Sequence, residues 1–249
     1  GMGQFPSMSV EERNLLCKAW VAAGHSEGLY MIAHVGSSVA SDAIKMSKFA
    51  AISGADAIAA VPPYYDRTNS IPRLIEWLRP VLAAADKLPF FYYHIPGATD
   101  VTINVYQFSL QAAKELPTFA GIKYVEDNTQ DFLNCVTDPA LKHVVFMWAP
   151  EPKLQSFAFP GRGTILAESF YAGTFLRMWD QFNVQKDMGA ARVEQQWKNK
   201  VEAVFSANGG TVAKRAVYSR LAGVDMGPAR GPDDRTVLTP TQKDKLTTE

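Results

Sequence analysis

The sequence predicts an α/β fold: a TIM (β/α)8-type barrel that lacks about its first two strands and carries C-terminal helices. Six short apolar segments alternate with helical segments and recur about every 25 to 30 residues, the period of a strand–helix unit. The apolar segments are continuous, which is typical of parallel strands covered on both faces. Residues 35–38, after the first segment, lack the glycine spacing of a dinucleotide-binding sheet, so the barrel is favoured over an open sheet.

Apolar runs predict the strands, and the periodic segments between them predict the helices. Prolines mark the ends of some strands, as at Pro62 and Pro96. The predicted strands span residues 29–35, 57–61, 90–95, 119–125, 144–148 and 164–167. After a first helix that begins beyond Ser9, the predicted helices span residues 38–53, 71–86, 104–115, 129–136, 153–159, 169–207 and 211–221.

The first helix is expected to begin with a capping box. Ser9 stands three residues before Glu12, the spacing at which each side chain binds the other residue's backbone amide. Gly24 is expected to end the helix. Its apolar face, which is expected to point inward, comprises Leu15, Leu16, Ala19, Trp20 and Ala23.

Six strands are two short of a closed barrel. The chain begins in a predicted strand-to-helix loop, so one strand, one helix and a second strand are expected to be missing before residue 1. An incomplete barrel is expected over residues 1–183, with a helical extension packed on it over residues 184–249. The open edges at 29–35 and 164–167 are expected to be covered by a second copy of the chain or drawn together.

The composition argues against several classes of partner. Of 249 residues, 47% are hydrophobic and 20% are charged, and 25 basic residues match 25 acidic ones. A net charge of zero gives no reason to expect nucleic acid or an anionic membrane as partner. The sequence shows no apolar run of roughly 18 residues, no signal peptide, and no metal or redox spacing of its two cysteines. We therefore expect a cytoplasmic protein.

Lys123 is the first candidate for chemistry, because it lies inside the apolar strand predicted over residues 119–125. Burial would desolvate its ammonium group and lower its pKa, which favours the neutral amine that a Schiff-base nucleophile requires. The alternative is a lysine near a strand end whose head group reaches water.

Tyr93 is the second candidate, since it lies near the end of the preceding strand and the carboxyl ends of barrel strands face the active site. Tyr93 and Lys123 are one strand–helix unit apart, so we expect them on neighbouring strands about 5 Å apart. A phenol in that place can relay protons. The alternative is a core tyrosine with a satisfied hydroxyl, and the adjacent His94 is interpreted as structural.

Several short motifs occur together along the chain. They are Tyr-His-Ile-Pro at 93–96, Gly-Ile-Lys at 121–123, Gly-Ala-Asp at 54–56, Val-Pro-Pro-Tyr-Tyr at 61–65, Ser-Met-Ser-Val-Glu-Glu-Arg at 7–13 and Met-Gly-Pro at 226–228. In combination the sequence resembles the N-acetylneuraminate lyase and dihydrodipicolinate synthase family of class I pyruvate aldolases. The resemblance extends over residues 3–228.

The resemblance implies a (β/α)8 barrel with C-terminal helices and a homo-oligomer, a dimer or tetramer. Lys123 would form a Schiff base with pyruvate and Tyr93 would relay protons, with a small keto acid as substrate and no metal or organic cofactor. Tyr65 matches an aromatic residue that often belongs to a tyrosine network across a subunit interface. A loop aromatic that covers the barrel rim is the alternative for Tyr65.

Within the family, the chain is most similar to the animal-type lyases. Gly-Ala-Thr at 97–99 follows the Tyr-His-Ile-Pro motif as in their loop, and no arginine follows until Arg162. The synthases usually place an arginine shortly after the proline. The implied substrate is a 2-keto sugar acid such as N-acetylneuraminate. A synthase-like enzyme, or a catalytically impaired fragment or binding protein of the family, remains an alternative.

The positions that the resemblance assigns to substrate binding differ from the lyase pattern. Gly3 is kept from the Gly-Thr-Thr-Gly-Glu carboxylate loop, but neither threonine is present. Val125 stands where the lyases carry serine or threonine, and Glu151 lies in the stretch that replaces Gly-x-Asp-Glu. Ala167 replaces the serine of the last strand loop, with Glu168 next. A site with fewer polar partners discriminates less strongly between sugars.

Overall fold

A computed structural model describes residues 3–150, 153–159, 163–228, 230 and 238–241. The chain divides into two compact units. One unit comprises Met8–Ile165, and the other joins the residues up to Ser7 to those from Leu166 onward. The domain boundary predicted between residues 183 and 184 stays a prediction.

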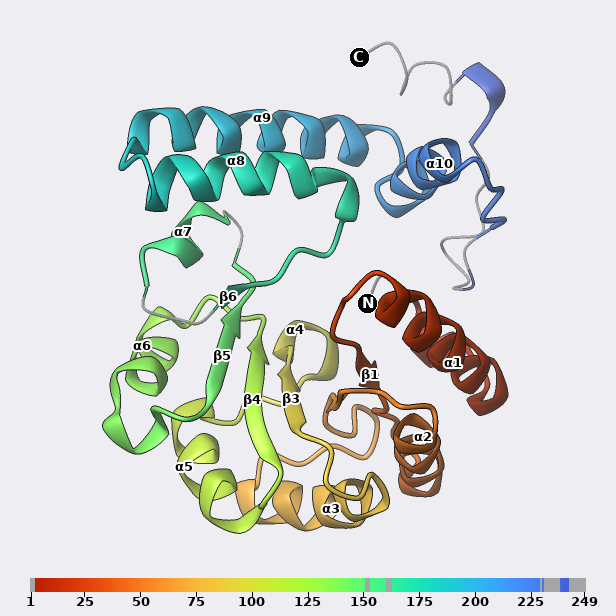
Figure 1. The fold of residues 1–249 in the computed structure, drawn as a ribbon, viewed down its shortest axis with the longest axis vertical. Coiled ribbons are helices and arrows are strands. Elements are labelled where there is room, and N and C mark those ends of the chain that lie inside the picture. Colours follow the sequence, from red (N-terminus) through yellow and green to blue (C-terminus); the bar gives the residue numbers. More distant parts are fainter. Residues whose placement is uncertain (1–2, 151–152, 160–162, 229, 231–237, 242–249) are drawn as a thin grey trace. The chain divides into compact units, whose positions relative to one another are not determined.

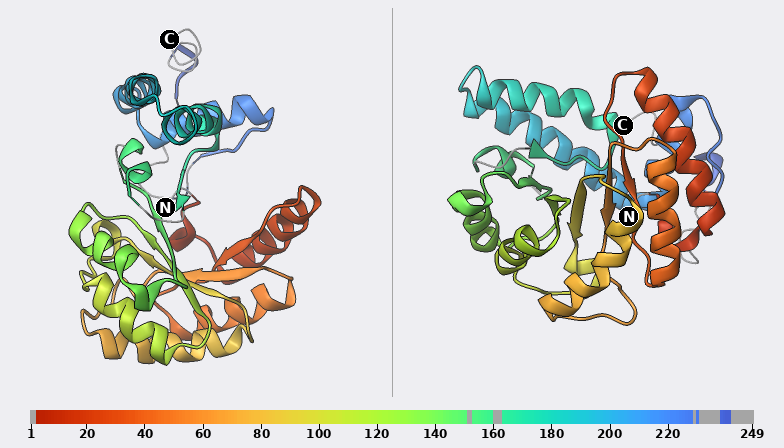
Figure 2. Two further views of the ribbon diagram at one scale, coloured as in Figure 1. Left: turned by 60° about the vertical axis from the view of Figure 1, so that its left-hand side comes forward. Right: turned by 60° about the horizontal axis from the view of Figure 1, so that its bottom comes forward.

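The unit Met8–Ile165 is built on six parallel strands that follow one another in sequence order. The strands curl into part of a barrel, with helices along the outer face (Figures 1 and 2). The strands are β1 (Ile32–His34), β2 (Ala57–Ala60), β3 (Phe90–His94), β4 (Phe119–Tyr124), β5 (Val145–Trp148) and β6 (Gly163–Thr164). The predicted parallel α/β architecture is confirmed. In the described residues β1 and β6 do not pair, so the expectation that the two edges are drawn together is wrong here.

Both edge strands are shorter than predicted. The strand expected over residues 29–35 is reduced to β1, and Leu29 and Tyr30 are 58% and 87% exposed. The strand expected over residues 164–167 is reduced to the two residues of β6. An edge strand pairs on one side only, so its ladder of hydrogen bonds ends sooner than that of an inner strand.

Four helices cover the outer face of the sheet (Figure 1): α2 (Ala40–Ile52), α3 (Ile71–Ala84), α5 (Val105–Glu115) and α6 (Thr129–Thr137). Aromatic pairs join them to the strands. Phe108 of α5 packs on Tyr92 with ring centroids 4.6 Å apart, and Phe132 of α6 stacks on Trp148 at 4.8 Å. Two short helices, α4 (Pro96–Thr99) and α7 (Leu154–Phe157), follow β3 and β5, and α7 is shorter than the helix predicted over residues 153–159.

Helix α1 (Val10–Ser26) begins with the predicted capping box. The hydroxyl of Ser9 accepts the Glu12 N–H, and the Glu12 carboxylate accepts the Ser9 N–H. The predicted stop at Gly24 is wrong, because the helix continues to Ser26 and Gly28, at φ +70°, makes the turn. A Cβ atom at Gly24 would meet the flexible side chain of Met31, which would have to move.

The apolar face of α1 is not buried within its unit, contrary to the prediction. Leu15, Leu16 and Trp20 are 69%, 43% and 58% exposed, whereas Val21 is buried. The helix lies beside α2 and the edge strand β1 (Figure 1). Because no further strand follows β1 on that side of the described sheet, only one side of α1 is covered.

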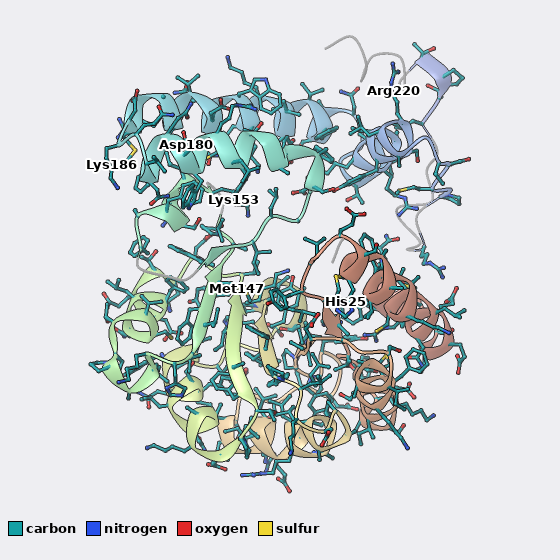
Figure 3. The ribbon with its side chains drawn as sticks, viewed as in Figure 1. His25, Met147, Lys153, Asp180, Lys186 and Arg220 are labelled. Atoms are coloured by element: carbon teal, nitrogen blue, oxygen red, sulfur yellow. The ribbon has the colours of Figure 1, made fainter. Side chains whose placement is uncertain are left out.

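The other unit is helical and contains η1 (Phe5–Ser7), η3 (Ser169–Tyr171), α8 (Ala172–Asn183), α9 (Met188–Ala207) and α10 (Thr211–Ala222). Helices α8 and α9 lie side by side and antiparallel (Figures 1 and 2). The single helix predicted over residues 169–207 is therefore wrong. Lys186, labelled in Figure 3, lies in the turn at φ 58°, and Asp187 caps α9 by accepting the Ala190 N–H. No helix among the described residues is long and apolar enough to cross a membrane.

Gly121 on β4 allows a close approach of neighbouring strands. A Cβ atom there would meet the Val145 carbonyl oxygen and lie 2.6 Å from Cε1 of Phe91. We expect Gly121→Ala to lower the free energy of unfolding by about 1–3 kcal/mol, because backbone and a packed ring would have to shift. Urea unfolding followed by circular dichroism measures this difference.

Gly97→Ala is the matched control for Gly121→Ala. Nothing lies within 4 Å of a Cβ built at Gly97, so its unfolding free energy should change by under about 0.5 kcal/mol. Equal values for the two variants would show that the strands at Gly121 can accept a methyl group.

Candidate functional site

Tyr93 and Lys123 lie opposite each other near the carboxyl ends of β3 and β4. The strand register pairs Tyr93 with Lys123 and His94 with Tyr124. Side chains alternate between the faces of a strand, so Tyr93 and Lys123 share the inner face, away from the covering helices. The expected placement of the two residues on neighbouring strands is confirmed.

Lys123 is a shielded amine. Its Nζ lies 4.1 Å from the centroid of the Tyr93 ring, and among the described residues it makes no hydrogen bond or ion pair. Burial lowers the pKa of Lys123, and the nearby charge of Lys153 lowers it further. A larger fraction of the amine is therefore neutral at a given pH than in a free lysine, and the neutral amine is the nucleophilic form.

Tyr93 keeps its proton at neutral pH. Burial raises the pKa of the phenol above its ordinary value of 10.0. On its other side, the ring meets the His34 ring edge-on, with centroids 6.1 Å apart. A protonated phenol that contacts an amine of lowered pKa can carry protons to and from a group bound between them.

The structure adds His34 and Arg13 to this region, and the sequence analysis missed both. His34 lies on β1, and Arg13 of α1 donates to the carbonyl oxygens of His34 and Gly36, each at 2.8 Å. A guanidinium nitrogen of Arg13 also lies 3.3 Å from Nδ1 of His34. Burial, with the charge of Arg13, lowers the pKa of His34 to about 3, so this imidazole is neutral at neutral pH. In the sequence, the one sign of a role for His34 was its place within an apolar predicted strand.

Met147 of β5 and Lys153, which follows β5 in the chain, are both labelled in Figure 3 and both act on the surroundings of Lys123. Met147 pairs with Lys123 in the strand register and therefore shares its face. Lys153, whose side chain is almost fully buried, immediately precedes α7. The predicted helix over residues 153–159 included Lys153, but no motif linked this residue to Lys123.

Two of the predicted substrate-binding residues lie, like Lys123, at or beyond the carboxyl ends of the strands. Val125 directly follows β4 and is half-buried. Tyr65 lies in the loop after β2 and is 83% exposed. In the described part of the chain no hydrogen bond or ring contact joins Tyr65 to Tyr93 or Lys123. The exposed phenol is compatible with both interpretations of this residue.

The other three predicted residues do not belong to the described part of the unit Met8–Ile165. Gly3 and Ala167 belong to the other unit, and Glu151 lies outside the described residues. The binding roles of all five residues stay predictions. Where side chains are described, no three His, Cys, Asp or Glu residues gather as a metal site. At the carboxyl ends of β3 and β4, the described site consists of the amine of Lys123 beside the phenol of Tyr93.

Known proteins are similar to this chain in fold and in sequence. The family model described as the dihydrodipicolinate synthetase family matches residues 1–247. N-acetylneuraminate lyase A of Xenopus laevis is 30% identical over 234 residues, which are 92% of this chain and 75% of the relative. The solved structure of Proteus mirabilis N-acetylneuraminate lyase matches with a TM-score of 0.89 at 23% identity, over 99% of this chain and 82% of the other.

A second solved structure, the Ruminococcus gnavus sialic acid aldolase catalytic lysine mutant, matches with a TM-score of 0.85 at 20% identity. The match covers 99% of this chain and 79% of the other. At these identities the two structures show a common fold, whereas the family model matches nearly the full sequence. The chain belongs to the dihydrodipicolinate synthetase family.

Proposed function

We propose that the chain is a pyruvate-dependent aldolase in which Lys123 forms a Schiff base with the keto acid and Tyr93 relays protons. The observation that carries the proposal is the amine of Lys123, which has a lowered pKa and lies 4.1 Å from the Tyr93 ring centroid. The Ruminococcus gnavus relative is described as a catalytic lysine mutant, which supports lysine chemistry in this fold.

The proposed reaction uses groups of the protein and substrate, without a cofactor. The lone pair of Lys123 Nζ attacks the keto carbon, and the keto oxygen leaves as water, which produces an iminium. In cleavage, the C4 hydroxyl loses its proton and the C3–C4 bond breaks. The bonding electrons pass to the iminium and give an enamine and an aldehyde. Protonation of the enamine and addition of water then release pyruvate and the free amine, with Tyr93 as the proposed proton carrier.

The proposed substrate is a 2-keto sugar acid such as N-acetylneuraminate. The names of the relatives, N-acetylneuraminate lyase and sialic acid aldolase, support this choice. So does the absence of arginine between residues 97 and 161. The alternatives are a dihydrodipicolinate synthase-like enzyme, which the family name favours, and a catalytically impaired fragment or binding protein. A screen of aldehyde partners with pyruvate separates the two enzymatic readings.

The proposal extends to the assembly. The two edges β1 and β6, which are unpaired in the described residues, support a (β/α)8-type barrel of which about two strands are absent. The exposed Tyr65 supports a homo-oligomer, a dimer or tetramer, in which a neighbouring subunit covers this residue. The proposed location is the cytoplasm. Gly3, Val125, Glu151 and Ala167 remain the proposed substrate contacts.

Lys123→Ala should abolish the mass increase that pyruvate and borohydride produce in the unmodified protein, since the reduced bond needs this amine. Intact-mass spectrometry measures the adduct. Lys87→Ala, which removes an exposed lysine, is the control and should trap pyruvate normally. Undiminished trapping in Lys123→Ala would assign the Schiff base to another residue, and no trapping in the unmodified protein would favour the impaired or binding reading.

Tyr93→Phe should slow turnover by roughly 10² or more, because the variant loses a positioned proton donor and keeps the ring. Tyr92→Phe is the matched control. Tyr92 is fully buried on the other face of β3, and its hydroxyl has no hydrogen-bond partner in the described residues. Steady-state release of pyruvate measures both variants. Equal rates for the two would reduce Tyr93 to a packing residue.

The pH dependence of trapping should report the lowered pKa of Lys123. Only the neutral amine attacks, so the initial rate should rise with pH and level off above the pKa. The midpoint should lie below the ordinary lysine value of 10.5. Lys153→Met should move the midpoint upward, because removal of a nearby positive charge favours the charged amine. A midpoint at or above 10.5 in the unmodified protein would contradict the desolvated environment.

A further inference from the structure

A buried His94 pairs with a partly exposed Glu126 on the face of the sheet opposite Lys123. Nε2 of His94 lies 2.8 Å from a carboxylate oxygen of Glu126. The His94 side chain is 1% exposed. Burial lowers the pKa of His94, although the hydrogen bond to Glu126 opposes the shift. The imidazole is therefore neutral at neutral pH and donates its Nε2–H to the carboxylate.

Neighbouring rings restrict His94. Its ring lies 6.1 Å from that of Tyr92 and is stacked on that of Tyr124 at 5.4 Å. Nδ1 is buried and has no hydrogen-bond partner among the described residues. An apolar ring would fill this space without leaving a buried polar atom unpaired. Packing alone therefore does not account for a histidine, whereas its hydrogen bond to Glu126 does.

Glu126 joins the carboxyl ends of three neighbouring strands. Its carboxylate accepts the His94 N–H from β3 and lies 3.2 Å from the hydroxyl of Tyr124 on β4, which also reaches the Asn128 carbonyl oxygen at 2.9 Å. Its backbone carbonyl accepts the indole N–H of Trp148 from β5 at 3.0 Å. A shift of the end of β3 or of β5 against β4 would disturb the hydrogen bond that His94 or Trp148 makes to Glu126.

We propose that His94 and Glu126 form a carboxylate latch that positions Tyr93 and Lys123 for the reaction proposed above, on which this inference rests. Tyr93 directly precedes His94, and Lys123 stands three residues before Glu126. The latch lies on the other face of the sheet, so it acts on the reacting groups through the backbone. His94 and Glu126 are positioning residues in this account.

The distance between Lys123 and Tyr93 depends on how β3 and β4 are positioned relative to each other along the strand direction. Besides the latch, the Val125 N–H donates to the His94 carbonyl oxygen at 2.9 Å, and the Ala149 N–H donates to the Tyr124 carbonyl oxygen at 2.9 Å. These are the last backbone hydrogen bonds, or rungs, of the ladders that join β4 to β3 and to β5. Small misplacements of catalytic groups cost large factors in rate, so loosening these rungs should slow the chemical step.

Three variants test the latch by activity. Glu126→Ala removes the acceptor, His94→Phe keeps a stacked ring without the donor, and Glu126→Gln keeps an acceptor oxygen. We expect the first two to lower kcat about 10-fold or more with KM changed less than about 3-fold, and Glu126→Gln to stay within about 3-fold of the unmodified protein. Rates are taken per site that traps pyruvate, so partial unfolding does not imitate a loss of kcat.

His25→Phe is the matched control, since His25 makes the same kind of pair elsewhere. Its Nε2 lies 2.9 Å from the carboxylate of Asp56 at the start of β2. This variant should leave kcat unchanged. Lower thermal stability with unchanged kcat in Glu126→Ala would make the pair merely structural and would overturn the proposal.

Hydrogen exchange gives a readout that does not need turnover. In Glu126→Ala the amides of Val125 and Ala149 should exchange at least about 10-fold faster than in the unmodified protein or in His25→Phe, because the last rungs of β4 lose their support. If the unmodified protein neither traps pyruvate nor turns over, the proposed function fails, while the latch is still judged by exchange. Unchanged exchange at both amides would overturn the latch whether or not the protein is active.

Discussion

The desolvated amine of Lys123 against the face of Tyr93 is the interaction on which the site depends. A lysine on an inner strand loses the hydration of its ammonium, and burial lowers its pKa as a result. The strand register holds Tyr93 directly opposite, so the amine has an aromatic neighbour and a source of protons in one place. An ion-pair partner would stabilise the charged amine and leave a smaller fraction of it neutral. The absence of such a partner among the described residues is what makes the position chemically useful.

The two faces of β3 and β4 have different roles: the inner face carries the candidate site and the outer face packs against the helices. The inner face of β3 and β4 carries Tyr93 and Lys123, while the outer face carries Tyr92, His94 and Tyr124 within the aromatic core. Rigidity comes from that core. Because alternate residues of a strand point to opposite sides, packing against helices α5 and α6 fixes the backbone without touching Tyr93 or Lys123. A change in the core can therefore alter catalysis through strand position alone.

Local patterns were sufficient to predict part of this arrangement. The period of apolar segments predicted six parallel strands, and strand spacing predicted that Tyr93 and Lys123 would be neighbours. The capping box at Ser9 was predictable because it involves residues three apart. The motifs led to the family that the comparisons establish.

What was missed depends on contacts that the sequence pattern does not encode. Gly24 was expected to end α1, but the helix continues to Ser26 and Gly28 makes the turn. The turn at Lys186, which separates α8 from α9, interrupts a sequence whose helical pattern is continuous. The exposure of Trp20 follows from its place beside an edge strand, where amphipathicity does not reveal which side is covered. Lys153 was predicted within a helix, but its effect on Lys123 is a contact between distant parts of the chain, which helical periodicity does not reveal.

The central claim is that the amine of Lys123 reacts while the hydroxyl of Tyr93 faces the product of that reaction. A crystal structure of the protein after reaction with pyruvate and borohydride tests both parts at once. The account predicts a covalent bond from Nζ of Lys123 to the former keto carbon, with the Tyr93 hydroxyl within hydrogen-bonding distance, about 2.6–3.2 Å, of the bound acid. A bond to any other lysine, or a Tyr93 hydroxyl turned away from the adduct, would contradict it.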